Sequence, residues 1–186
     1  MRNRLKQISK DKESAVWIRI PTRLEKTDTM IKDVLIDNSQ NWKGDHIKSF
    51  KINYGKSYDE IDFLQNMYSK DWEKLANFNI EFTTTCCKFL NIHTKLIKSS
   101  DLNCTGKKGE LVFNICKELG ATDYLTSVGA INYLENYRKM FENENIKIFY
   151  HNYKHPIYKQ RGKTFLENLS VLDLILNEKE NASKFI

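Results

Sequence analysis

Histidine, tyrosine and glutamine side chains crowd one short stretch near the end of the chain, Tyr150 to Gln160. It contains His151, His155 and three tyrosines. A histidine can move protons near neutral pH, and tyrosine and glutamine can donate hydrogen bonds to sugar hydroxyls, phosphates or carboxylates. Because no acidic residue lies at short spacing from the two histidines, the pattern favours proton transfer and polar binding over a metal site. An exposed polar loop is the alternative.

The segment Leu169 to Asn177 is the second candidate. Ser170, Asp173 and Asn177 stand at positions i, i+3 and i+7, so they share one face of a helix whose other residues are apolar. Such a stripe either lines a pocket or faces water. Ser170 and Asp173 also have the spacing of a capping box, which is a structural explanation for the same residues.

Two further patterns are weaker. Trp42 and His46 stand four residues apart on a predicted helix, where core packing with a hydrogen-bonded imidazole is the simpler interpretation. The segment Thr126 to Ala130 reads as a strand end, a small-residue turn and a helix start, which can present backbone N–H groups to an anion. No glycine-rich dinucleotide-binding or P-loop motif accompanies that turn.

The four cysteines are Cys86, Cys87, Cys104 and Cys116. Adjacent cysteines suit a disulfide framework poorly, and the spacing needed for a zinc site is absent. Cys86 and Cys87 fall in a predicted helix, where buried thiols are common. We therefore expect reduced thiols, no metal and no cofactor, and only a remote prospect of cysteine catalysis.

Short strands and amphipathic helices alternate along the chain, which predicts an α/β fold of one domain over residues 1–186, with a largely parallel sheet flanked by helices. In such sheets ligands gather at the carboxyl ends of strands. The expected strands are Ala15 to Ile20, Asp33 to Ile36, Lys95 to Ile97, Asp123 to Ser127 and Ile146 to Tyr150. The expected helices include Ser39 to Tyr54, a capped helix from Ser57 to Met67, Gly109 to Leu119, Ile131 to Glu142 and Leu169 to Asn177.

The chain has 186 residues, 30 lysines and arginines, and 24 aspartates and glutamates, which gives a formal net charge of +6. These positive charges are interleaved with acids, whereas a nucleic-acid binder concentrates them on one surface. The excess of positive charge suits a phosphorylated or nucleotide-linked small molecule better than a nucleic acid. No signal peptide and no apolar run of membrane-spanning length is visible. We expect a cytoplasmic protein that binds neither nucleic acid nor membrane.

Several segments, taken in order, resemble the WbqC-like family of bacterial surface-polysaccharide gene clusters, and they extend over nearly the whole chain. No single segment is diagnostic, but the ordered set is fairly specific, above all its last member. The segments are Arg2-Asn-Arg-Leu-Lys6, Trp17-Ile-Arg-Ile-Pro21, Trp42 with His46, Tyr54, Ile115 to Tyr124, Ser127, Gly129, Tyr133-Leu134, His155-Pro-x-Tyr158-x-Gln160, Phe165, and Leu169 to Asn177.

The resemblance departs from the family at the N-terminus. Family members usually begin with a strand and a His/Gln-Pro-Tyr segment ahead of the Arg-Asn-Arg stretch, whereas this sequence starts at that stretch. We therefore expect an incomplete N-terminal edge, through truncation, a misassigned start or degeneration. A missing first strand would leave an unpaired sheet edge that invites a second copy of the chain, so a homo-oligomer is one expectation.

The resemblance implies a cytoplasmic role in O-antigen, lipopolysaccharide or other surface-glycan biosynthesis. The implied reaction is a transferase-like step on an activated, nucleotide-linked amino sugar or on its acyl or aminoacyl substituent. In this hypothesis His155 is a general base and Asp173 orients it. Arg4 and the turn at Ser127 would hold a phosphate or carboxylate. The substrate-binding residues implied are Arg4, His46, Tyr54, Ser127, Tyr158, Gln160, Ser170 and Asn177.

A non-enzymatic binding or assembly protein of the same pathway is the alternative hypothesis. It would engage a carrier or another pathway protein, and the basic surface would suit an acidic partner. Nucleotide-linked sugars should bind saturably under the first hypothesis, and only a protein partner should do so under the second. Both the transferase hypothesis and its site require that the loop around Pro156 and the polar face of the last helix meet in a shared cavity.

Overall fold

The computed structural model describes residues 4–9, 11, 13–23 and 29–186, with side chains from Lys6 onward in the first strand. Contacts between residues cluster into two compact units. The first unit combines residues 1–94 with His155–Ile186, and the second comprises Lys95–Lys154. Because the second unit's residues fall between the two parts of the first, the first unit is assembled from segments far apart in the sequence. That the chain forms one domain stays a prediction.

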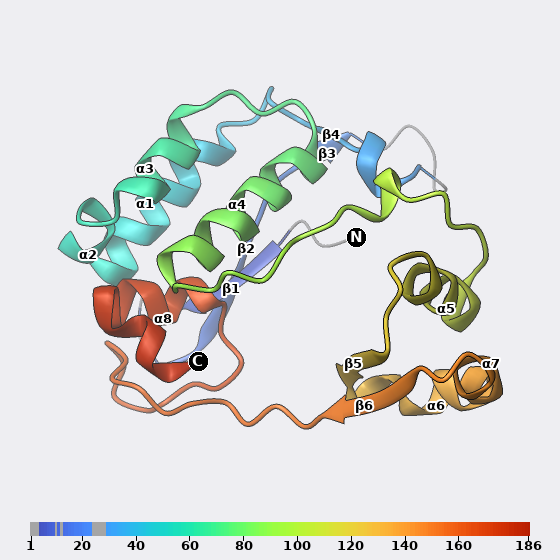
Figure 1. Ribbon diagram of the computed structural model, residues 1–186. Coiled ribbons are helices and arrows are strands. Elements are labelled where there is room, and N and C mark those ends of the chain that lie inside the picture. The colour runs from blue at the N-terminus through green and yellow to red at the C-terminus, as the bar shows by residue number, and fades with distance from the viewer. Residues whose placement is uncertain (1–3, 10, 12, 24–28) are drawn as a thin grey trace. The chain divides into compact units, whose positions relative to one another are not determined.

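Two short antiparallel strand pairs belong to the first unit (Figure 1). Strand β1 (Arg4–Ile8) pairs with β2 (Ala15–Arg19), and Gln7 lies opposite Val16. Strand β3 (Thr22–Arg23) pairs with β4 (Leu35–Ile36). Pro21 separates β2 from β3, as its missing N–H predicts for a strand end. The strand expected at Asp33 to Ile36 is therefore present, but it begins later.

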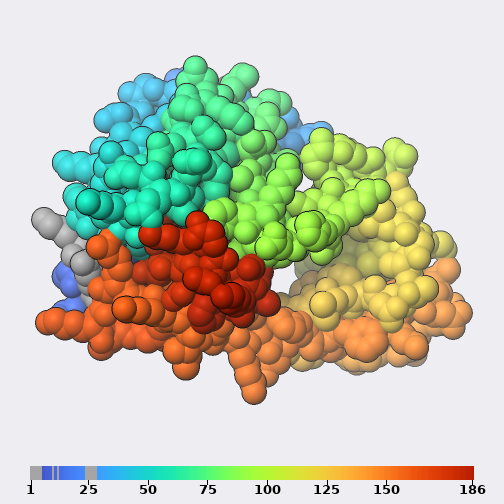
Figure 2. All heavy atoms as spheres, turned by 60° about the vertical axis from the view of Figure 1, so that its left-hand side comes forward, coloured from blue at the N-terminus to red at the C-terminus, as the bar shows by residue number. Residues whose placement is uncertain are grey.

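The longest elements of the first unit are α-helices. Its α-helices are α1 (Trp42–Tyr54), α2 (Lys56–Asp59), α3 (Asp62–Ser69), α4 (Leu75–Phe89) and α8 (Val171–Glu178). Short 3-10 helices span Ile31–Asp33 and Lys179–Phe185. Core packing, predicted for Trp42 and His46 of α1, is confirmed, because both are buried together with Phe50 and Asn53 on the same face. Figure 2 shows the C-terminal helices, in dark red, against the turquoise helices of the same unit, where α8 contacts α2.

The expected helix from Ser57 to Met67 is two helices. Ser57 lies inside α2 and caps nothing, and the chain breaks between α2 and α3 at Glu60 and Ile61. The capping-box prediction at Ser57 is therefore wrong. It failed because Gly55, with a φ of 61°, ends α1 and lets a new helical turn start directly at Lys56.

The first unit has one apolar core. Phe50, Leu64 and Leu75 are fully buried in it. Leu172 and Ile175 of α8 join the same core, so the C-terminal helix packs with elements from the first half of the chain. The backbone N–H of Ser170 donates to the carbonyl of Lys6 at 2.8 Å, which fastens the start of α8 to β1.

The second unit contains the one parallel strand pair among the described residues. Strand β5 (Asp123–Ser127) pairs with β6 (Lys147–His151). Its helices are α5 (Lys108–Glu118), α6 (Ile131–Leu134) and α7 (Arg138–Asn143). Further 3-10 turns span Ser99–Asp101, Val128–Ala130 and Glu135–Tyr137. Residues 95–97, expected as a strand, are exposed and lie in no strand.

A small core of Phe113, Leu134, Phe141 and Ile146 holds the second unit together. Gly120 follows α5 with a φ of 63°, and the N–H of the next residue, Ala121, donates to the carbonyl of Cys116. This is the C-cap expected for a glycine at that place. The helix expected over Ile131 to Glu142 is instead two short helices joined by a 3-10 turn.

The fold is thus mixed α/β, as predicted. The expectation of parallel pairing holds for β5 and β6, whereas the two strand pairs of the first unit are antiparallel. In the described part of the chain no helix reaches the length and apolar character that crossing a membrane requires.

Candidate functional site

A buried carboxylate bound by two tyrosines lies inside the first unit. Asp173, on the first turn of α8, is 1% exposed. Its Oδ1 accepts a hydrogen bond from the Tyr54 hydroxyl at 2.7 Å, and its Oδ2 accepts one from the Tyr158 hydroxyl at 2.8 Å. The loop after Pro156 and the last helix therefore meet at Asp173, in a buried contact.

Four segments position this cluster. Tyr54 is the last residue of α1, and its hydroxyl also accepts the backbone N–H of Ile8 in β1 at 3.4 Å. Gln160 fastens the loop that carries Tyr158. Its Nε2 donates to the carbonyl of Leu166 at 2.9 Å and its Oε1 accepts the Leu166 N–H at 2.8 Å. The same Nε2 lies 3.3 Å from the Tyr158 hydroxyl, so Gln160 shapes the loop and extends the network.

His155 lies beside this network and is only partly buried. Its Nδ1 is 2.9 Å from the carbonyl oxygen of Pro156. A carbonyl can only accept, so Nδ1 carries the proton in the neutral ring and the lone pair lies on Nε2. The imidazole also packs against the rings of Tyr158 and Phe165, with centroids 5.9 and 5.6 Å away. This is the tautomer that a general base needs if Nε2 is the reacting atom.

Burial dominates the electrostatics of the cluster. It raises the pKa of Asp173 above its ordinary value, while the bonds from Tyr54, Tyr158 and Gln160 and the charge of His155 act in the opposite direction. Burial, and then the nearby carboxylate, also raises the pKa of Tyr54. Tyr54 therefore keeps its proton and acts as a donor. A positive charge on His155 and a negative charge on Asp173 favour each other.

The other predicted residues of the last helix serve the helix itself. Ser170 is the N-cap of α8, and its Oγ accepts the backbone N–H of Leu172 at 3.3 Å. The side chain of Asn177 donates to the backbone carbonyl of Asp173 at 2.7 Å. The capping interpretation thus holds for Ser170, whereas Asp173 turns inward to the tyrosines. Of the three side chains in the predicted polar stripe, the Asp173 carboxylate is the one bound to the tyrosine cluster.

His46 belongs to a different cluster. It is buried, its Nε2 lies 2.9 Å from the carbonyl of Arg19, and its Nδ1 lies 3.0 Å from the hydroxyl of Tyr68. The carbonyl accepts from Nε2–H, so Nδ1 accepts from the tyrosine. Burial lowers the pKa of His46. Both nitrogens of the neutral ring are occupied, which is the structural role that the sequence left open for it.

The two predicted anion ligands are Ser127 and Arg4. Ser127 is the exposed last residue of β5 and belongs to the second unit. The side chain of Arg4 lies outside what the structure describes. Cys86 is buried, and this burial raises its pKa to about 12, which keeps the thiol protonated and unreactive. Among the described residues, no three His, Cys, Asp or Glu side chains are grouped as a metal site would require.

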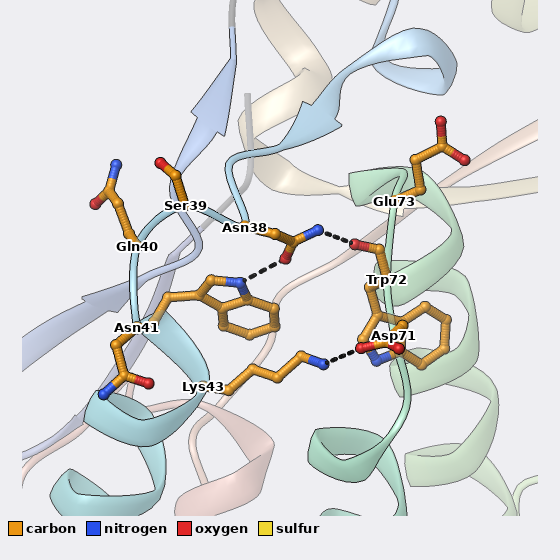
Figure 3. Close-up of a pocket in the computed structure, with 9 residues that line it drawn as sticks. Asn38, Ser39, Gln40, Asn41, Lys43, Asp71, Trp72 and Glu73 are labelled. Atoms are coloured by element: carbon orange, nitrogen blue, oxygen red, sulfur yellow. Dashed lines mark hydrogen bonds and ion pairs between the residues drawn. The ribbon is translucent and has the colours of Figure 1, made fainter.

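Polar residues that the sequence interpretation missed surround the start of α1. A cavity of about 680 Å³ is lined by residues 38–43 and 71–73 (Figure 3). The amide of Asn38 bridges its two sides, because Oδ1 accepts the indole N–H of Trp42 at 3.1 Å and Nδ2 donates to the carbonyl of Trp72 at 2.8 Å. The run of four polar residues Asn38 to Asn41 before a helix was the available signal. Its pairing with the Asp-Trp-Glu segment was not visible in the sequence.

The model of the WbqC-like protein family matches residues 1–185, so the chain belongs to that family. An uncharacterized protein of Mycobacterium tuberculosis (strain ATCC 25618 / H37Rv), Rv1507c, is 27% identical over 191 residues, an alignment that covers 100% of this chain and 80% of the relative. No solved structure matches the chain.

Proposed function

We propose that this protein performs a transferase-like step on an activated, nucleotide-linked amino sugar, or on its acyl or aminoacyl substituent, in bacterial surface-polysaccharide biosynthesis. One observation carries the chemical part of this proposal. The half-buried His155 has its lone pair on Nε2 and packs on Tyr158, which is bonded to the buried Asp173. Membership of the WbqC-like family supports the pathway.

In the proposed reaction, His155 Nε2 takes the proton from an attacking amine or hydroxyl. The electron pair released forms the new bond to the electrophilic carbon of the activated donor. The imidazolium then returns the proton to the leaving group as the donor bond breaks, so no oxidant or reductant is needed. Arg4 is proposed to hold the phosphate or carboxylate of the substrate, and Tyr158, Gln160 and Asn177 are proposed to bind its polar groups.

Asp173 is a positioning residue in this scheme. Its carboxylate bonds Tyr158, whose ring packs on His155, and its charge favours the imidazolium. The Pro156 carbonyl, which accepts Nδ1–H, fixes the ring itself. Replacing Asp173 by asparagine should therefore shift the acidic limb of the pH profile of turnover to lower pH, because the imidazolium loses a stabilising negative charge and the neutral base forms more easily. A purely structural role would change the amount of folded protein and leave the profile in place.

The test compares His155→Ala with His93→Ala, a matched change at an exposed histidine of the same unit. Nucleotide-linked amino sugars are incubated with an activated acyl or aminoacyl donor, and the product is detected by mass spectrometry. We expect His155→Ala to abolish turnover and to leave the melting temperature nearly unchanged, and His93→Ala to alter neither.

Three outcomes would contradict the proposal: full turnover in His155→Ala, unfolding of that variant, or no product with the unaltered protein. A calorimetric titration then distinguishes the transferase from the alternative, a non-enzymatic assembly protein. Saturable binding of nucleotide-linked sugars supports the transferase, and binding of a pathway protein without any sugar binding supports the assembly role.

A further inference from the structure

The cavity beside the first turn of α1 shares no lining residue with the tyrosine and carboxylate cluster around Asp173. Its volume of about 680 Å³ falls within the range of small-molecule sites, which is roughly 300–1,000 Å³. One wall is the loop and helix start at residues 38–43, and the other is the segment 71–73 that precedes α4. Both walls belong to the first unit.

Hydrogen bonds fix the loop on one side of the cavity. The Asp37 carboxylate accepts the Ser39 hydroxyl at 2.7 Å, the Ser39 N–H at 3.2 Å and the Gln40 Nε2 at 2.8 Å. These bonds lower the pKa of Asp37 to about 2, so the carboxylate stays charged. Together with the Asn38 bridge to the opposite wall, they hold the pocket in shape before a ligand arrives, which reduces the entropy lost on binding.

The polar groups around the opening can both donate and accept. Ser39, Gln40 and Asn41 are exposed and contribute one hydroxyl and two amides. Asn41 is the N-cap of α1, yet its side chain makes no capping hydrogen bond. It lies instead over Gly44, where an added Cβ would stand 2.6 Å from Asn41 Nδ2. A ligand that carries hydroxyl groups can use donors and acceptors placed side by side in this way.

The charges around the cavity disfavour anions. The Lys43 ammonium lies 3.2 Å from the Asp71 carboxylate and also donates to the backbone carbonyl of Lys70 (Figure 3). Glu73 adds a second carboxylate, so the lining carries two acids against one lysine. A phosphate would meet a lysine that is already paired with Asp71, and it would also meet the second carboxylate, Glu73. A neutral ligand avoids this repulsion.

Two indoles supply the apolar part of the lining. Trp42 is buried, with its indole N–H bonded to Asn38, and Trp72 is half-buried, with its indole N–H bonded to the carbonyl of Met67 at 2.7 Å. Their ring N–H groups are thus occupied, and the rings contribute chiefly apolar surface. Apolar rings beside a few fixed polar groups are typical of small-molecule sites.

We propose that this cavity binds a neutral, hydroxyl-bearing saccharide unit through Ser39, Gln40 and Asn41, with its apolar face against the two tryptophans. This goes beyond the proposed function, because it needs no reaction at His155. It gives the protein a second saccharide site, in addition to the one proposed for the activated sugar.

The test uses saturation-transfer difference NMR with the whole protein and the methyl glycosides of glucose, galactose, mannose and N-acetylglucosamine. Glucuronic acid and inorganic phosphate serve as anionic probes. At least one neutral glycoside should receive saturation, and the amide resonances that shift should belong to residues 38–43 and 71–73. Glucuronic acid should bind severalfold more weakly than methyl glucoside, and phosphate should not bind there.

Variants locate the binding. Asn41→Ala should weaken it about tenfold, because the ligand loses one hydrogen-bonding partner. Gly44→Ala should weaken it as well, since the new methyl group displaces the Asn41 side chain while alanine suits a helix. Asn77→Ala, at an exposed asparagine of α4 outside the cavity, is the matched control and should bind normally. The double variant Asp71→Asn, Glu73→Gln should bring the affinity for glucuronic acid closer to that for methyl glucoside.

Three results would overturn the proposal: no saturation of any neutral glycoside, shifted resonances that cluster around Asp173 instead, or unchanged binding in both Asn41→Ala and Gly44→Ala. Loss of turnover in His155→Ala leaves this binding in place, so failure of the transferase proposal and failure of this one are distinguishable.

Discussion

Two buried titratable side chains in the first unit, His46 and Asp173, are held in different ways. His46 is packed among the rings of Trp42, Phe50 and Tyr68, and both of its nitrogens are bonded within the protein. Asp173 accepts two tyrosine hydroxyls, but its neighbour across Tyr158 is a histidine that is only partly buried. Burial of a titratable group therefore does not by itself mark a site. What distinguishes Asp173 is the partly exposed imidazole of His155, which packs on its bonding partner Tyr158.

The contributions of the two residues to folding stability should also change with pH in opposite directions. The pKa of His46 is lowered in the folded protein, so its contribution to stability is present above its ordinary value of 6.5 and is lost as the pH falls through the folded value. The pKa of Asp173 is raised, so its contribution is present below 3.8 and is lost as the pH rises through the folded value. Mutations at each position can separate these effects.

Replacing Asp173 should have the largest effect. Asp173→Ala leaves the hydroxyls of Tyr54 and Tyr158 buried without their acceptor and opens a small void, so we expect a loss of about 3–5 kcal/mol in the free energy of unfolding. Asp59→Ala removes an exposed aspartate paired with Lys51 and should cost less than about 1 kcal/mol. Urea unfolding at pH 7 measures both. A loss equal to that of the control would show that the tyrosine and carboxylate cluster does not stabilise the fold.

His46→Phe should have a smaller effect. The ring volume is kept, but the Tyr68 hydroxyl and the Arg19 carbonyl lose their partner, which should cost about 2 kcal/mol. Below pH 6.5 the wild type should lose stability as His46 takes up a proton. The variant should not show this loss, because phenylalanine cannot take up a proton. His93→Phe at an exposed position is the control. Parallel stability curves for wild type and His46→Phe between pH 7 and 5 would contradict the assignment of a neutral, buried imidazole.

The smallest predicted effect is the change with pH in the free energy of unfolding of Asp173→Asn. The amide fits the site, so its overall cost should be small compared with that of alanine. Because the wild-type carboxyl must ionise against its raised pKa, the asparagine variant should gain stability relative to wild type as the pH rises above 3.8. Urea unfolding across that range tests the sign. A relative gain for wild type with rising pH would mean that the tyrosine bonds outweigh burial.

The sequence predicted local features better than long-range ones. The fold class and several helix positions follow from spacing and residue type, and the loop around Pro156 was expected to meet the last helix. Asp173 was expected to orient His155, whereas its carboxylate accepts the hydroxyls of Tyr54 and Tyr158. The tautomer of His155 was not predictable, because it depends on one backbone carbonyl. The same holds for His46, whose two bonding partners come from β2 and α3.

Strand pairing was the least predictable part of the fold. Alternating strands and helices favour parallel pairing, yet β1 and β2 form an antiparallel pair, with residues 9–14 between them. Strands of two residues, such as β3 and β4, carry too little pattern to reveal a partner. The cavity at Asn38 was missed for a related reason, since its second wall is contributed by residues more than a helix away along the chain.

The division of the first unit between the two ends of the chain has a consequence for biosynthesis. The hydrogen bond from Tyr54 to Asp173 joins residues 119 positions apart, and β1 receives its bond from Ser170 only when the last segment exists. A nascent chain emerging from the ribosome can complete residues 95–154 while residues 1–94 still lack α8. Closing so distant a contact is entropically slow. Residues 1–94 must therefore wait, with part of their apolar surface uncovered, until residues 155–186 have been synthesised.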